Sequence, residues 1–120
     1  MSKASEILLD ILRSELHGYS IIPEYYVRYK GRKLFIDYYI PGLCLAVECD
    51  GEQHFKYVSA WHKTIEKFKD SVYRDRLKDQ WANENHITLI RLRGATEILD
   101  SEFGKKWFRS KIHHHIQGSN

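Results

Sequence analysis

The sequence predicts an α/β fold in which a mixed central sheet is flanked by helices. Three observations support this prediction: a segment with helical spacing near the N-terminus, three strand-like segments before residue 51, and a fourth strand-like segment between two helical ones. At 120 residues the chain is long enough for one hydrophobic core. We therefore expect a single domain over residues 1–112, followed by an unstructured tail over 113–120.

The elements are predicted in the order helix, three strands, helix, strand, helix. Apolar residues spaced three and four apart predict the first helix over residues 3–16. Glycine and proline separate the strands, which we expect at 25–29, 33–40 and 43–50, with turns at Lys30-Gly31-Arg32 and Pro41-Gly42. The remaining elements are a helical stretch over 60–85, as one helix or two, a strand over 86–93 and a helix over 95–112.

Composition places the chain among folded globular proteins. Hydrophobic residues make up 42% and charged residues 29%, and no apolar run reaches the roughly 20 residues that cross a bilayer. We expect no membrane segment and no secretory leader. Cys44 and Cys49 lie in one predicted strand, too far apart for a disulfide, so reduced thiols and a cytoplasmic location are expected. The net charge of +3 is compatible with a nucleic-acid partner without requiring one.

The predicted hairpin over residues 33–50 carries the acidic residues of most interest. With the two-residue loop given above, Ile40 pairs with Leu43, and Asp37 lies diagonal to Glu48. Because strand side chains alternate, Asp37, Glu48 and Asp50 then share one face. Three neighbouring carboxylates repel one another unless a cation binds between them, and Mg²⁺ prefers oxygen ligands. Taken alone, the same pattern is also typical of a solvated strand face.

Two segments of the sequence carry a resemblance to a known class of nuclease. Asp37, ten intervening residues and Glu48-x-Asp50 resemble the signature of PD-(D/E)XK nucleases, in which an aspartate precedes a strand with Glu-x-Lys. Two longer segments, IDYYIPGLCLAVECDGEQHF and RDRLKDQWANENHITLIRL, resemble the Vsr-like branch of this class. That branch includes very-short-patch repair endonucleases and the phage homing endonucleases called EDxHD. It covers roughly residues 5–93. The resemblance implies a restriction-endonuclease-like fold and a metal-dependent DNA endonuclease of phage or bacterial type, with Mg²⁺ as cofactor, replaceable by Mn²⁺.

The resemblance also implies roles for particular residues. The pattern carries over to Glu6, Asp37, His54 and Asp75, with Glu48 and Asp50 as the strand acids and Gln53 as the neighbour of His54. Asp37, Glu48, Asp50 and the backbone carbonyl of Cys49 would hold the metal, and His54 would act as the general base. Asp50 stands where the pattern has a lysine, so the cationic role passes to His54 or Lys78. Helical periodicity favours Glu15 over Glu6 on the inner side of the first helix, which leaves that acid open.

The long helix and the last strand offer further polar candidates. Asp75, Lys78 and Asp79 share one helix face, either as a salt-bridged solvent surface or with Lys78 at the scissile phosphate. Arg91 and Arg93 share one face of the last strand, where a DNA backbone could run. Sequence-specific reading of DNA would need a homodimer or fusion to a specificity domain. Two other functions remain open: a non-catalytic DNA-binding domain on a degenerate nuclease fold, and an RNA-processing nuclease.

Overall fold

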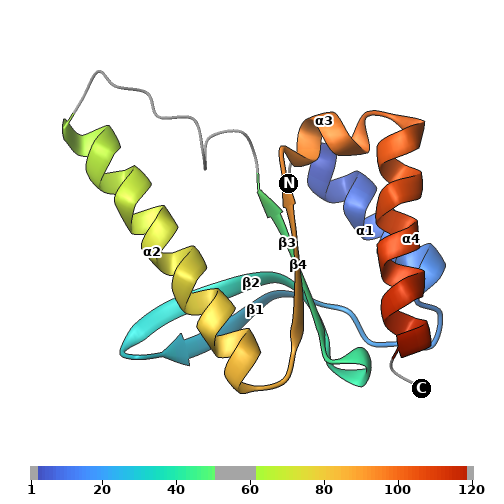
Figure 1. The fold of residues 1–120 in the computed structure, drawn as a ribbon, viewed down its shortest axis with the longest axis horizontal. Coiled ribbons are helices and arrows are strands. Elements are labelled where there is room, and N and C mark those ends of the chain that lie inside the picture. Colours follow the sequence, from blue (N-terminus) through green and yellow to red (C-terminus); the bar gives the residue numbers. More distant parts are fainter. Residues whose placement is uncertain (1–2, 51–61, 119–120) are drawn as a thin grey trace.

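The computed structural model of the protein describes residues 3–50 and 62–118. Within these ranges the strands form a mixed sheet in the order β1-β2-β3-β4, in which β3 and β4 run parallel and the other neighbours run antiparallel (Figure 1). The elements are α1 (Lys3–Glu15), β1 (Ile22–Tyr29), β2 (Arg32–Ile40), the 3₁₀ helix η1 (Pro41–Leu43), β3 (Leu45–Asp50), α2 (His62–Glu84), β4 (Thr88–Arg93), α3 (Ala95–Leu99) and α4 (Glu102–Gly118).

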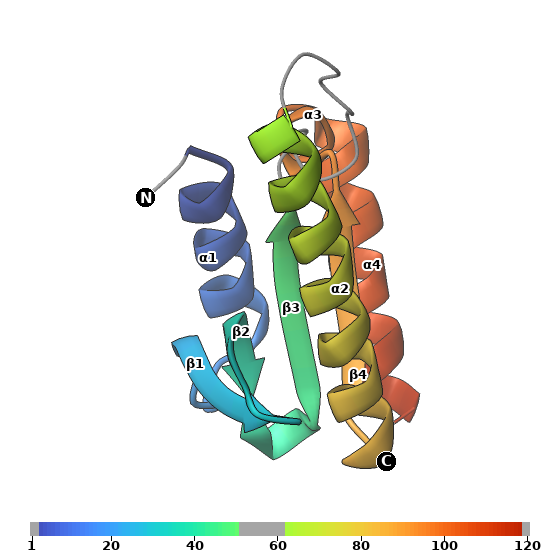
Figure 2. The same ribbon diagram turned by 90° about the vertical axis from the view of Figure 1, so that its left-hand side faces the viewer.

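Helices cover both faces of the sheet. Helix α2 lies on one face, whereas α1, α3 and α4 pack together on the other (Figure 1, Figure 2). The predicted α/β architecture, a mixed sheet with flanking helices, is therefore confirmed. Among the helices of the described ranges, none combines the length and the apolar character that a membrane crossing requires.

Strand β3 lies at the centre of the hydrophobic core. Its Leu45 and Val47 are buried in a cluster with residues of α1, α3 and α4, including Phe108. Its Ala46 belongs to a smaller cluster under α2, together with Trp81. Fully burying a leucine-sized side chain stabilises a fold by about 1.5–3 kcal/mol. The larger cluster is therefore the main source of stability in the described part of the chain.

The hairpin between β1 and β2 turns at the predicted position. Tyr29 pairs with Arg32, so Lys30 and Gly31 are the two loop residues, with φ angles of 48° and 76°. Two consecutive positive φ angles are typical of a type I′ turn, whose twist matches that of the two strands. Gly31 adopts this conformation without a Cβ clash, because glycine carries no side chain.

The connection between β2 and β3 differs from the prediction. Pro41–Leu43 form η1, and Cys44 follows in the left-handed conformation with a φ of 48°, so the connection is longer than a two-residue loop. Ile40 therefore pairs with Leu45 instead of Leu43. The register differs by two residues, an even number, so the shift preserves which side chains share a face.

The helical segments differ from the prediction at two points, whereas residues 62–84 form the single helix α2. The segment predicted as one helix over 95–112 is divided, because Ser101 caps α4: its Oγ accepts the Gly104 N–H at 2.9 Å. Gly104 lies so close to α3 that a Cβ there would be 1.8 Å from the Ile98 carbonyl oxygen. Helix α4 continues to Gly118, so the segment predicted as a tail is helical over residues 113–118.

Candidate functional site

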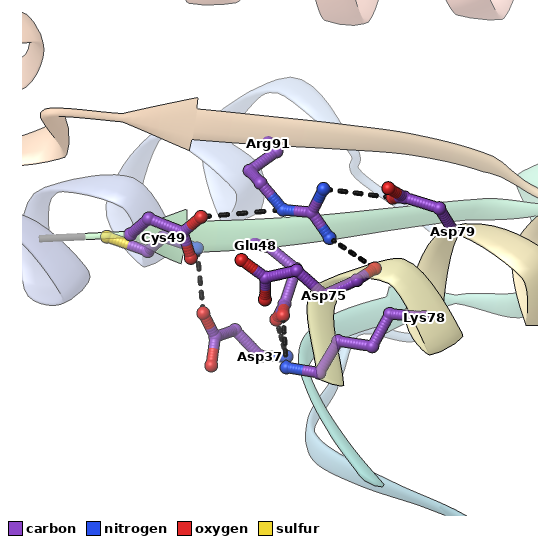
Figure 3. A network of polar contacts seen from close by, with 8 residues as sticks. Asp37, Glu48, Cys49, Asp75, Lys78, Asp79 and Arg91 are labelled. Atoms are coloured by element: carbon purple, nitrogen blue, oxygen red, sulfur yellow. Dashed lines mark hydrogen bonds and ion pairs between the residues drawn. The ribbon is translucent and has the colours of Figure 1, made fainter. Parts of the chain in front are cut away.

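Two carboxylates, Asp37 and Glu48, face each other where strands β2 and β3 separate. The paired residues of the two strands end at Tyr38 and Val47, and one step further the side chains bridge the strands. The Asp37 N–H donates to Glu48 Oε2 at 2.7 Å, and the Cys49 N–H donates to Asp37 Oδ2 at 2.7 Å (Figure 3). Each carboxylate thus has one oxygen fixed by a main-chain donor, which holds both groups in place.

The sheet is irregular at Asp37. On β2, Ile36 belongs to the cluster under α2, whereas Tyr38 belongs to the cluster under α1, α3 and α4. Residues two apart in a regular strand share a face, so the strand changes its facing at Asp37. On the neighbouring strand β1, Glu24 lies between the two residues that pair with Ile36 and Tyr38, and it has a φ of 47°. Strand irregularities of this kind redirect a side chain and are common beside functional sites.

Glu48 is buried and is paired with a cation from α2. The residue is 1% exposed, and Lys78 Nζ forms an ion pair with its Oε1. Burial, followed by the charge of Asp37, raises the pKa of Glu48 more than Lys78 lowers it. Burial also raises the pKa of Asp37, against the lowering by the Cys49 N–H and by Lys78. A buried and a half-buried carboxyl group whose pKa values are both raised favour a proton or a cation beside them.

Arg91 of β4 connects Asp50 to helix α2. Its Nε lies 3.4 Å from Asp50 Oδ2, its Nη1 lies 2.9 Å from Asp79 Oδ1, and its Nη2 donates to the Asp75 carbonyl oxygen at 3.4 Å (Figure 3). The Arg91 side chain is 10% exposed. Arg91 therefore lies inside the protein and ties three elements together, and it is not on the surface where the sequence placed a DNA backbone.

Arg91 is the residue whose role in this network the sequence did not reveal. The parallel register pairs Arg91 with Glu48, whereas the residue that pairs with Asp50 is Arg93, two positions further along β4. Two signals were present in the sequence. Asp50 replaces a lysine, and an arginine within a strand of apolar residues requires an acceptor when it is buried. The missing information was the register between β3 and β4, which are far apart along the chain.

The two acids considered on the first helix occupy different places. Glu15 forms ion pairs with Arg109 and His113 of α4, so it belongs to the contact between these helices. Glu6 is exposed on α1, which packs on the face of the sheet opposite α2 (Figure 2). Glu15, which helical periodicity favoured, is therefore the more buried of the two acids, but its carboxylate is directed toward α4.

The remaining predicted site residues have separate outcomes. Lys78 and Asp79 lie on the face of α2 that meets the sheet, in contact with Glu48 and Arg91 respectively. Asp75 lies on the same helix, and Figure 3 shows its side chain extending on the side of β3 that carries Glu48. Gln53 and His54 lie outside the described residues.

The chemistry of the site suits Mg²⁺ better than a thiophilic metal. Within residues 3–50 and 62–118, no three histidine, cysteine, aspartate or glutamate side chains form a group that could hold an ion. Asp50, predicted as a ligand, is directed at Arg91, which leaves Asp37 and Glu48. Burial raises the pKa of the Cys49 thiol to about 11, so it is protonated at neutral pH. Two carboxylates are enough for Mg²⁺, which keeps several waters and takes further ligands from substrate phosphates.

Comparison with known proteins gives two viral relatives. No protein-family model matches the chain, and no solved structure matches it. The chain is 47% identical over 57 residues to uncharacterized protein 307L of Invertebrate iridescent virus 6. It is 33% identical over 70 residues to uncharacterized protein 033L of Invertebrate iridescent virus 3. The matches cover 48% and 58% of this chain but only 29% and 36% of the relatives, so the chain spans about a third of their length.

Proposed function

We propose that the protein is a metal-dependent DNA endonuclease with a restriction-endonuclease-like fold. The observation that carries the proposal is the opposed pair Asp37 and Glu48, with the Lys78 ammonium on Glu48. These are two acids and one cation in a single cluster at the end of a hairpin. The resemblance noted in the sequence involves the same aspartate and glutamate. Lys78 is a suitable substitute for the lysine that the pattern has at the position of Asp50.

The residues of the cluster have distinct roles in this proposal. Asp37 and Glu48 would hold Mg²⁺ or Mn²⁺, which when bound polarises a phosphate and lowers the pKa of its water. Lys78 turns its ammonium from Glu48 to a non-bridging phosphate oxygen and offsets the charge that develops there. Arg91 keeps α2, and with it Lys78, against the sheet. His54 takes a proton from the attacking water.

The proposal extends to partners and location. DNA is the substrate, and sequence preference would come from a homodimer or from fusion to a specificity domain, because one small domain reads few base edges. A cytoplasmic, reducing compartment suits Cys44 and Cys49, which are both free thiols.

A non-catalytic DNA-binding domain is the second candidate, and one observation favours it. Asp50 stands where the nuclease pattern has a lysine, and the partner that it faces is Arg91. An ion pair of this kind fixes β3, β4 and α2 relative to one another whether or not a phosphodiester is cleaved. An RNA-processing nuclease would use the same chemistry as the main proposal and would differ in its substrate.

A nicking assay on supercoiled plasmid tests the proposed activity. We expect nicking with Mg²⁺ or Mn²⁺ and none with EDTA. Asp37→Asn and Lys78→Met should each lower the rate about 10²-fold or more, the usual size of effect when one preorganised electrostatic contact is removed. Asp10→Asn and Lys67→Met are matched controls, because they change the same residue types at exposed positions, on α1 and α2 respectively. Both controls should nick at the parental rate.

Three results would contradict the main proposal. Wild-type protein that binds DNA but cleaves no duplex, branched or single-stranded substrate with either metal would favour the non-catalytic domain. Cleavage of RNA and not of DNA would favour the RNA-processing enzyme. Parental nicking by Asp37→Asn would remove the Asp37–Glu48 pair from the chemistry.

A further inference from the structure

A hollow lies along β4, one of the two outer strands of the sheet. It is a groove of about 960 Å³ between β4, the η1 turn and helix α4. The β4 side is formed by residues 88–91, and the α4 side includes Trp107, Lys111, His114 and His115. The groove thus follows the edge of the sheet on the side of α4, whereas the Asp37–Glu48 pair faces α2.

The groove is suited to an anion. Among the described residues that line it, none is an aspartate or a glutamate. The sequence from Phe103 to Gly118, which is nearly all of α4, also lacks acids, although the chain contains 16 of them. Lys111 contributes a positive charge to the groove, and the rings of His86 and His114 add N–H donors. A polyanion therefore meets donors, and no aspartate or glutamate, along the described part of this surface.

Trp107 provides the groove with an aromatic wall. It is 40% exposed, and the Lys111 ammonium lies 5.4 Å from the centroid of its ring. Proteins that bind single-stranded nucleic acids combine such exposed rings, on which bases stack, with cations that contact the adjoining phosphates. A base in a duplex is already stacked on its neighbours, so only an unpaired base can use the Trp107 ring.

The groove reaches the edge of the proposed active site. Arg91 lines it, and the same residue contacts Asp50 and Asp79 in the polar network under α2. The groove and the network that holds Lys78 thus have Arg91 of the edge strand β4 in common. Because Arg91 is engaged by two carboxylates, Lys111 is the cation of the groove that a phosphate would meet.

We propose that this groove binds a single-stranded segment of nucleic acid, with an unpaired base on Trp107 and a phosphate at Lys111. The identification of the polymer as DNA rests on the proposed function. An acidic polypeptide would also be attracted to Lys111, but it offers no purine or pyrimidine ring to Trp107. The tryptophan therefore distinguishes the two kinds of ligand.

Binding of fluorescein-labelled twelve-residue oligothymidylate to the full chain tests the groove. Fluorescence anisotropy is measured in EDTA, so that no cleavage occurs. Lys111→Glu should raise Kd about tenfold, and Trp107→Leu should also raise it about tenfold, within the range known for the loss of one stacked base. Lys106→Glu is the matched control: it reverses the same charge on the same helix, outside the residues that line the groove, and should change Kd less than threefold. Thermal melting verifies that each variant is folded.

A second readout follows the aromatic contact directly. Oligothymidylate should quench the tryptophan fluorescence of the wild type, and the quenching should be lost in Trp107→Leu. The proposal is overturned if wild type does not bind the oligonucleotide, or if Lys106→Glu weakens binding as much as Lys111→Glu. It is also overturned if poly-glutamate displaces the probe as well as unlabelled oligothymidylate does, since a polypeptide would then be the better ligand.

The proposal of a nucleic-acid groove and the proposal of an endonuclease can be contradicted independently of each other. Wild type that binds the probe through Lys111 and Trp107 but never nicks plasmid DNA would contradict the endonuclease and leave the groove in place. Wild type that nicks plasmid, while its binding of the probe does not depend on either residue, would contradict the groove and leave the endonuclease in place.

Discussion

Strand β3 has two faces that are equally buried but chemically unlike. One face meets α1, α3 and α4, and the other meets α2. Toward the three helices β3 presents Leu45 and Val47, both within an apolar cluster. Toward α2 it presents Glu48, which is as inaccessible to water as the apolar residues, and which is held by Lys78. Successive side chains of a strand point to opposite faces, so one short segment serves both environments.

This difference separates the residues that stabilise the fold from those that are available for chemistry. Burial of apolar surface stabilises directly, whereas a buried ion pair contributes little net stability, because its charges lose their hydration. The Glu48–Lys78 pair is therefore poorly explained as a stabilising device. Its geometry suits an exchange of partners, in which a metal ion and a phosphate replace part of the internal pairing. Substitutions on the two faces should accordingly affect different measured quantities.

The largest effect on stability is expected from the apolar face. Leu45→Ala should lower the free energy of unfolding by about 2–5 kcal/mol, because the fully buried position leaves a cavity that cannot collapse completely. Urea unfolding measures the loss. The nicking rate per folded molecule should stay near the parental value. A loss of stability below about 1 kcal/mol, outside the range for buried leucines, would show that the two faces do not differ as described.

A smaller effect is expected where Arg91 joins the strands to α2. Arg91→Met should lower the free energy of unfolding by about 1–3 kcal/mol, because it removes the cation that forms an ion pair with the buried Asp50 carboxylate. The double variant Arg91→Met/Asp50→Asn should recover part of that loss, since the remaining charge is then removed as well. A double-mutant cycle in urea gives the coupling. Strict additivity of the two substitutions would contradict the proposed pairing.

The smallest effect, and one of opposite sign, is expected from Asp37→Asn. Burial raises the pKa of Asp37, so the ionised carboxylate is less stable in the folded protein than in the unfolded chain. This destabilisation of the fold is present at pH values above the raised pKa, and it is absent at pH values below the ordinary pKa of aspartate. In EDTA at neutral pH the variant should therefore melt slightly above the parent, with the difference vanishing as the pH falls. The asparagine oxygen can still accept the Cys49 N–H.

The same melting curves test the metal. Mg²⁺ should raise the melting temperature of the parent, because a ligand of the native state stabilises it, and should leave Asp37→Asn unchanged. A variant that responds to Mg²⁺ as the parent does would show that Asp37 is not a ligand.

The parts of this contrast that depend on local rules could be predicted from the sequence. The alternation of strand side chains placed Asp37 and Glu48 together, and a register error of two residues left that relation intact, although the change of facing at Asp37 was not predicted. The turn at Lys30 and Gly31 was predictable because it lies between two strand-like segments and contains glycine. The assignment of His54 as the base remains a prediction.

The rest depends on conformations and contacts that local rules do not determine. The pairing of Glu48 with Lys78 requires the docking of α2, and the place of Arg91 requires the register of β3 with β4. The η1 turn was missed because Cys44 adopts a positive φ, which is uncommon for a residue with a side chain. The break at Ser101 was missed because apolar residues continue at helical spacing across it.

The parallel pairing of β3 with β4 has a consequence for the order in which the site is assembled. Parallel strands cannot be joined by a tight turn, so the chain must cross the sheet through α2 before β4 can pair. Asp37 and Glu48 lie on one hairpin and can meet early in folding, whereas Lys78 is 30 residues beyond Glu48 and must be brought in by a longer closure. A chain in the course of synthesis or refolding therefore carries both acids before it carries their cations. If the proposed nuclease activity is measured, it should therefore appear last, and its appearance would report that the whole domain is complete.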